Sequence, residues 1–492
     1  MLFNSVSFLI FFPLVAVLYY ILPPRFRWVL LLVASCYFYI AFIPAYILIL
    51  FYLIAIDFVM GQMIEKATGK KRKLFLIISI IANVGTLFIF KYFNFFNTNV
   101  EHLASVLHWN YSIQALRIAL PLGLSFHTFQ SLAYVIEVYY GRFPAERHLG
   151  IYALYVMFFP QLVAGPIERP QELLPQLHAT YDFNEGTVSQ GLKIMLWGFF
   201  KKVVVADTIG VFVDSVYGNL HAANGVLLAV ATVAFAIQLY GDFSGYSDIA
   251  RGSAKVFGIT LVNNFDAPYF SRSIADFWRR WHISLSSWFR DYFYQPLALS
   301  LARISRAGIP IALFVTFVLI GLWHGAAWNY VFFGALFGAY MVIGLLTKRV
   351  RGRIADALGI SRVPWLYSLL QTLVTFALVC IGFGVFRAAS LHDAFYLILH
   401  LGTGWSNALS RQFWTRAVLD QAVTGLTALR VFALPASVLL MLAGEYAQRR
   451  WDVIGRLAAR PRWLRWSAYY VLIFWILVLG YYHERAFIYF QF

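Results

Sequence analysis

Long apolar runs separated by short polar breaks are the main feature of the chain. Residues 5–22, 28–50 and 74–96 carry almost no charge, and a helix needs about 20 such residues to cross a bilayer. Further runs of this kind lie at 364–387, 431–447 and 466–482. Helices in a soluble core rarely stay apolar over this length. The pattern therefore predicts an all-α polytopic membrane protein.

The middle of the chain is apolar but interrupted. Pro, Gly, Asp, Lys and His fall inside the apolar segments 116–140, 150–164, 188–212, 224–250, 306–323 and 328–347. Polar groups at membrane depth are costly and usually line a cavity or a site. Residues 277–297 differ, because large apolar side chains recur there at steps of three and four residues. That spacing predicts an amphipathic helix at the interface or folded into the membrane.

Basic residues indicate which loops face inward, since short inner loops collect Lys and Arg. They cluster at 25–27, 66–73, 348–353 and 449–465. Alternating crossings then place both termini and the segment 388–430 on the outer side. No internal repeat or linker is evident, so residues 1–492 are predicted to form a single membrane domain.

Composition narrows the classes of function. Only 12% of the residues are charged, against about 25% in soluble proteins. The net charge of +17 follows from the basic inner loops, so we expect contact with membrane lipid and no nucleic-acid binding. Cys36 and Cys380 both lie in apolar runs and predict no disulfide framework. The first run lacks the basic start of a signal peptide and is predicted to be a retained helix.

His324 is the sharpest candidate for chemistry. It lies in Gly-Leu-Trp-His-Gly-Ala-Ala-Trp-Asn, residues 321–329, between two apolar runs. Apolar surroundings disfavour the charged imidazolium, which leaves a neutral base able to deprotonate a hydroxyl near neutral pH. Trp323 and Asn329 flank it as possible supporting residues. By spacing alone, His324 could equally be a structural histidine that is hydrogen-bonded inside a helix bundle.

Other polar residues in apolar surroundings are weaker candidates. His282 lies between Trp281 and Ile283, where an interfacial histidine is the plainer interpretation. No metal-ligand pattern accompanies the two histidines, so no metal site is predicted. Asp242 lies in a cluster of hydroxyl and carboxylate side chains at 240–248 and could orient a histidine or bind substrate. His127 is a further polar intrusion. No hydrolase, P-loop or dinucleotide motif is present.

Four segments resemble the membrane-bound O-acyltransferase superfamily, in the branch of the alginate O-acetyltransferase membrane subunit. They are residues 121–141, 158–176, 240–258 and 276–296, and the Trp-His-Gly element at 323–325 is similar to the family's histidine motif. The likeness runs from Asn4 to the C-terminus and is looser across 390–465. His127 departs from the family, in which Tyr is expected.

The resemblance implies a ring of roughly 11–14 transmembrane or re-entrant helices around a central tunnel. It implies that His324 is the essential catalytic histidine and that His282 is the second histidine of the superfamily. Asp207 matches a family position that supports activity. The C-terminal tail 483–492 resembles the tyrosine-bearing tail of the peptide partner in teichoic-acid D-alanylation. Tyr489 is therefore a candidate acyl relay, with an interfacial aromatic anchor as the alternative.

The expected function is acetyl transfer across the bacterial inner membrane for O-acetylation of an exported or cell-wall polysaccharide such as alginate. The expected donor is acetyl-CoA, with no bound cofactor. A periplasmic SGNH-type or alginate-modification acetyltransferase is the expected partner, and the polysaccharide is the final acceptor. Two alternatives stay open: D-alanyl-type transfer from a carrier protein, and a transporter or flippase with His282, Asp242 and Asp248 as a coupling relay.

Overall fold

The computed structural model describes residues 1–41, 44–118, 120–121, 123–162, 165–406, 426–482, 485 and 487–488. These residues form helices, joined by loops and one isolated bridge between Phe265 and Trp281. The chain divides into two compact units. Unit 1 comprises Met1–Met195 and Ser247–Val262, and unit 2 comprises Leu196–Tyr246 and Asn263–Phe492.

Unit 1 contains the helices of the first half of the chain. They are α1 (Val6–Ile21), α2 (Pro24–Ile40), η1 (Pro44–Tyr46), α3 (Ile47–Lys66), α4 (Gly69–Leu87), η2 (Phe88–Tyr92), α5 (Phe93–Val106), α6 (Leu124–Tyr139), α7 (Leu149–Met157), α8 (Pro170–His178) and most of α9 (Glu185–Phe199).

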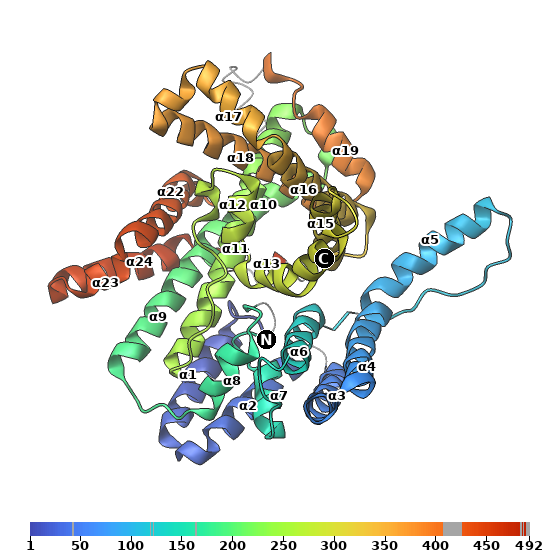
Figure 1. Ribbon diagram of the computed structural model, residues 1–492. Coiled ribbons are helices and arrows are strands. Elements are labelled where there is room, and N and C mark those ends of the chain that lie inside the picture. Colours follow the sequence, from blue (N-terminus) through green and yellow to red (C-terminus); the bar gives the residue numbers. More distant parts are fainter. Residues whose placement is uncertain are drawn as a thin grey trace. The chain divides into compact units, whose positions relative to one another are not determined.

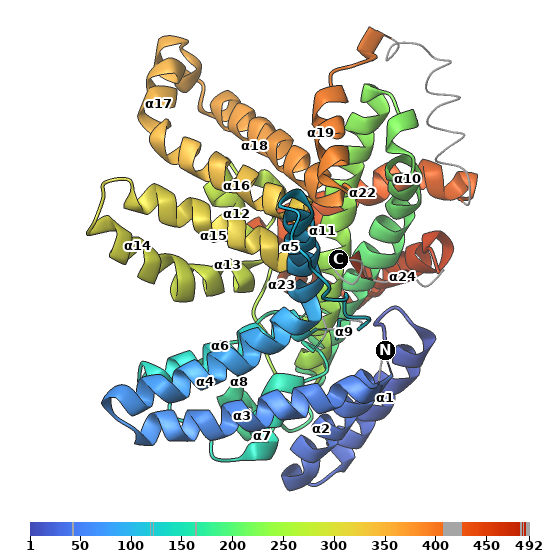
Figure 2. The ribbon, with the colours of Figure 1, turned by 90° about the vertical axis from the view of Figure 1, so that its right-hand side faces the viewer.

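The antiparallel pair α3 and α4 (Figures 1 and 2) is joined by a buried carboxylate. Asp57 on α3 accepts hydrogen bonds from Ser79 (2.5 Å) and Asn83 (2.9 Å) on α4. These donors replace the water that a buried carboxylate loses.

Unit 2 contains the remaining helices. In chain order they are η3 (Phe200–Ala206), α10 (Asp207–Tyr217), η4 (Leu220–Ala222), α11 (Gly225–Val256, whose last ten residues belong to unit 1), η5 (Pro268–Phe270), α12 (Ile274–Arg280), α13 (Ile283–Phe289), η6 (Arg290–Tyr294), α14 (Gln295–Ala302), α15 (Gly308–His324), α16 (Trp328–Leu346), α17 (Lys348–Ala357), η7 (Ile360–Arg362), α18 (Pro364–Arg387), α19 (Leu391–His400), α22 (Ala428–Trp451), α23 (Val453–Ala458) and α24 (Arg462–Leu479). Figure 2 shows α14, α15, α16 and α18 as successive neighbours.

The predicted all-α polytopic membrane fold is confirmed. Among the described residues, seven helices are long and apolar enough to cross a membrane, and α1 and α15 are shorter apolar helices. The run predicted at 364–387 coincides with α18. The sidedness of the termini and of 388–430 stays a prediction, and residues 407–425 lie outside the described part of the chain.

The prediction of one amphipathic helix over 277–297 is wrong. The backbone breaks at His282, which adopts a left-handed conformation (φ 45°) between α12 and α13. Asn264 explains the break, because its carbonyl accepts the Ile283 N–H (3.0 Å) and its side-chain oxygen accepts the Ser284 N–H (3.2 Å). Asn264 thus provides acceptors for the first backbone N–H groups of α13, which a continuous helix would have bonded to its own preceding turn.

Glycines allow α15 and α16 to pack at close range. A Cβ on Gly334 would lie 2.4 Å from the Phe317 carbonyl oxygen and 3.1 Å from the Gly321 Cα. A Cβ on Gly321 would lie 2.2 Å from the Tyr330 carbonyl oxygen. All of these are backbone atoms, which cannot turn aside. Small residues at such crossings are typical of membrane helices, where packing drives association.

We expect Gly334→Ala to destabilise the detergent-purified protein by about 1–3 kcal/mol, because the added methyl group forces α15 and α16 apart. Gly344→Ala is the matched control, since Gly344 lies on the same helix with open space around it. There, alanine should be neutral or stabilise by up to about 1 kcal/mol. Thermal unfolding of both variants checks this, and equal melting temperatures would contradict the close packing.

Candidate active site

His324 is the last residue of α15, and its side chain is buried in unit 2. Its ring lies edge-on to Phe386 and Phe333, with centroids 5.3 Å and 5.8 Å away. The helix ends here because the backbone becomes extended at Gly325. A Cβ on Gly325 would lie 2.2 Å from the ring of Tyr330, so only glycine fits beneath this tyrosine. The result is a histidine held at a helix end among aromatic rings.

His282 is fully buried at the break between α12 and α13. It lies outside the seven helices of membrane length. Burial lowers the pKa of His282 to about 3, because an imidazolium would lose its hydration there. The ring is therefore neutral at physiological pH. A left-handed conformation costs a non-glycine residue about 1–3 kcal/mol and is often kept where function requires it.

Trp323 lies beside both histidines. Its ring centroid is 6.2 Å from that of His282 and 4.8 Å from that of His324. Two residues 42 positions apart in the sequence are thus brought to the same indole. Phe243 of α11 covers His282 edge-on at 4.7 Å. The two imidazoles accordingly share a water-poor aromatic environment, where a neutral base keeps its ability to accept a proton.

A buried ion cluster lies in the same unit. The Lys202 ammonium is 2.8 Å from the Asp207 carboxylate and 2.7 Å from that of Asp242. All three side chains are almost completely buried. The sequence singled out both carboxylates but missed Lys202. A lysine inside an apolar run was the available signal, because such a charge requires a buried partner.

The end of the chain docks onto this cluster. The Tyr481 N–H donates to the Val203 carbonyl (2.9 Å), and the Ile488 N–H donates to the second oxygen of Asp242 (2.7 Å). The Phe487 ring is buried, stacks on Tyr246 at 4.6 Å and contacts Phe243 at 5.5 Å.

Phe243 therefore lies against both the tail and His282. The predicted acyl relay, Tyr489, follows Ile488 directly but lies outside the described residues.

Asn329, Asp248 and His127 contact other parts of the chain. Asn329 donates to the Ala388 carbonyl (2.8 Å) and so joins the start of α16 to the end of α18. Asp248 pairs with Arg251 at 3.1 Å within one helix turn, as expected of a structural ion pair. His127 is buried on α6 of unit 1, edge-on to Tyr39 at 6.5 Å. It belongs to the other unit from His282 and His324.

Comparison with known proteins identifies the chemistry. The family model of the membrane-bound O-acyltransferase family matches residues 147–354, which include both histidines. The chain is 35% identical to the probable alginate O-acetylase AlgI of Pseudomonas aeruginosa, over 88% of this chain and 82% of that protein.

More distant relatives carry other names. The peptidoglycan O-acetyltransferase of Helicobacter pylori is 32% identical over 80% of this chain and 78% of that protein. The teichoic acid D-alanyltransferase of Streptococcus thermophilus is 28% identical over 56% of this chain and 70% of that protein. All of these names describe transfer of an acyl group. The chain belongs to the membrane-bound O-acyltransferase family, in the branch of the alginate O-acetylases, and is a bacterial multi-pass membrane acyltransferase.

Proposed function

We propose that the protein moves acetyl groups from a thioester donor across the bacterial inner membrane for O-acetylation of an exported or cell-wall polysaccharide. One observation carries the proposal: two buried histidines flank Trp323, and the C-terminal tail is anchored beside one of them. The names of the alginate and peptidoglycan relatives support an acetyl group and a polysaccharide acceptor.

The proposed base is His324. Its neutral imidazole takes the proton from an accepting hydroxyl, and the resulting oxygen nucleophile attacks the thioester carbonyl. The carbon–sulfur bond then breaks, and the imidazolium returns its proton to the departing sulfur. The products are an O-acetyl ester and a free thiol. General base catalysis of this kind contributes about 10²–10⁴-fold, and the aromatic walls suppress hydrolysis by excluding water.

The proposed first acceptor is the Tyr489 hydroxyl. Phe487 and Ile488, which directly precede Tyr489 in the sequence, contact Tyr246 and Asp242, and these contacts support the proposal. Acetyl-CoA is the proposed donor, because the basic loops predicted on the inner side suit an anionic coenzyme. A periplasmic SGNH-type or alginate-modification partner then moves the acetyl group to the polysaccharide.

The sequence also left a transporter open, whereas the similar proteins are named as acyltransferases. The buried Lys202–Asp207–Asp242 cluster has the composition of a coupling relay. A transporter would consume no thioester, and His324→Ala would stop the movement of its substrate without changing donor turnover. Thioester consumption therefore separates the two classes.

We expect His324→Ala to lower acetyl transfer at least about 100-fold, since the base is lost. His282→Asn should also lower transfer strongly, while asparagine tolerates the left-handed backbone at that position. His102→Ala is the matched control, because His102 is exposed on α5. The measurement is thiol release from acetyl-CoA and from an acetylated carrier protein in proteoliposomes. Full activity of His324→Ala would refute the assignment.

We expect labelled donor to leave an acetyl ester on Tyr489, detected by mass spectrometry of the C-terminal peptide. Tyr489→Phe should lose this ester and the transfer to the partner, because phenylalanine has no hydroxyl. Tyr482→Phe is the control, since Tyr482 is exposed and lies before the tail 483–492. Transfer to the partner by Tyr489→Phe at the normal rate would show that the tail is only an anchor.

A further inference from the structure

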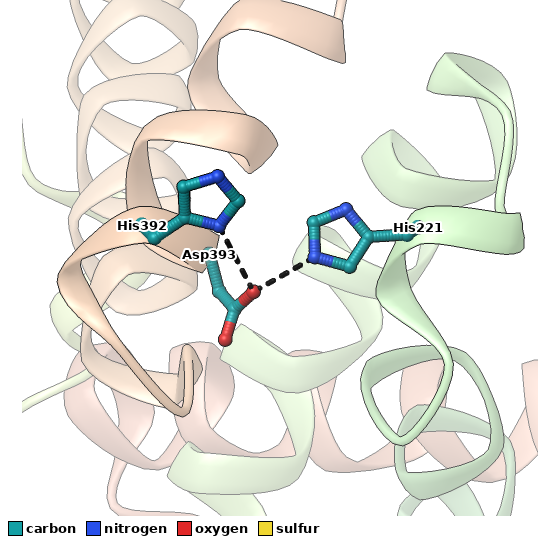
Figure 3. Close-up of side chains that lie close together, drawn as sticks. All are labelled: His221, His392 and Asp393. Atoms are coloured by element: carbon teal, nitrogen blue, oxygen red, sulfur yellow. Dashed lines mark hydrogen bonds and ion pairs between the residues drawn. The ribbon is translucent and has the colours of Figure 1, made fainter.

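Two histidines and one aspartate converge at the surface of unit 2, and none of them belongs to the proposed active site. His221 lies on η4, and His392 and Asp393 lie in the first turn of α19. Figure 3 shows both imidazoles pointing at the same carboxylate oxygen. The His221 Nε2 is 3.0 Å and the His392 Nδ1 is 3.9 Å from the Asp393 Oδ1. The three ligand atoms all lie within 4.8 Å of one another.

Neighbouring side chains hold two of the three ligands in place. Ser390 caps α19 by accepting the Asp393 N–H (3.0 Å), and its hydroxyl donates to the Asp393 Oδ2 (2.8 Å). This leaves Oδ1 facing the imidazoles. The ring of Tyr396 packs on His221 with centroids 4.2 Å apart, and its hydroxyl donates to the His221 carbonyl. Such supporting contacts are typical of metal sites.

We propose that His221, His392 and Asp393 bind a divalent metal ion of the zinc class. Zinc favours nitrogen and oxygen ligands at about 2.0–2.2 Å, which places tetrahedral ligand atoms about 3.3 Å apart. The His221 Nε2 and the Asp393 Oδ1, which are 3.0 Å apart, need to separate by only a few tenths of an ångström to reach this spacing. His392 has 82% of its side chain exposed and is able to turn inward. Water completes the coordination, as in other sites with three protein ligands.

An ordinary ion pair explains less of this arrangement. One imidazolium would be enough to pair with Asp393, yet a second imidazole faces the same oxygen. Two rings of like charge so close together would repel each other. Neutral rings around a cation avoid this repulsion. A metal ion would also join η4 to α19, two segments 172 residues apart in the chain.

The bound ion would stabilise the junction of η4 with α19. An ion pair lies close to α19 in the sequence, where Arg387 at the end of α18 pairs with Asp214 (2.9 Å), which also pairs with Arg485 (3.0 Å). The inference does not rest on the proposed acetyl transfer, because no step of that chemistry passes through these three residues. Its expected readouts are metal affinity and thermal stability.

The test uses the full chain in detergent, purified with a histidine-free affinity tag and stripped with EDTA. Calorimetric titration with Zn²⁺ should show one ion per chain, and Zn²⁺ should raise the melting temperature. Co²⁺ should give the visible absorption of a protein-bound ion. His392→Ala should weaken Zn²⁺ binding at least about tenfold. This exposed residue can be changed with little risk to folding.

His221→Ala and Asp393→Asn should have the same effect on affinity, and His102→Ala should have none. Absence of Zn²⁺ binding would overturn the inference. Unchanged affinity in His392→Ala would do so as well, since the ion would then bind elsewhere.

Discussion

The arrangement of unit 2 depends on the buried ion pairs of the Lys202 ammonium group. An ammonium ion removed from water loses several kcal/mol of hydration, and leaving it without a partner costs about 3–5 kcal/mol. The carboxylates of Asp207 and Asp242 compensate that charge at 2.8 Å and 2.7 Å. Asp207 begins α10 and Asp242 lies on α11. One cation therefore fixes η3, α10 and α11 together, because separating any of them would expose an unpaired charge to an apolar interior.

The same cluster positions the end of the chain. Asp242 uses one oxygen for Lys202 and the other for the Ile488 N–H. A charged acceptor makes this hydrogen bond stronger than a neutral one. The preceding Phe487 is then directed between Tyr246 and Phe243, and Phe243 covers His282. The ion cluster is thus connected to His282 through the contacts of Phe487 with Phe243 and of Phe243 with His282. The polar cluster and the aromatic site are parts of one arrangement.

The sequence predicts the helices better than their contacts. Apolar runs bounded by Pro, Gly and basic residues locate α18 to the residue, because bilayer length and capping are local properties. The break at His282 escapes this reasoning, since its cause is Asn264, which approaches from outside the periodic segment. Motif resemblance selects both histidines, but not that Trp323 lies beside each of them. The sequence also does not predict the contact of Ile488 with Asp242, because these residues are 246 positions apart.

In the proposed relay, the tail that carries the acyl group must be held long enough to react and must also leave. The described contacts suit both requirements. A neutral hydrogen bond contributes about 0.5–1.5 kcal/mol and one to a charged group about 1.5–3 kcal/mol, so the Tyr481 and Ile488 bonds together hold the tail only moderately. Tethering compensates for this, because an acceptor on the same chain has a high effective concentration at the site. The fixed part of the proposed mechanism is then the buried histidine pair with its aromatic walls, and the contacts that have to release are those of Phe487 and Ile488. In the proposed mechanism, this division lets one buried base serve both a thioester donor and a tyrosine acceptor while the aromatic walls exclude water.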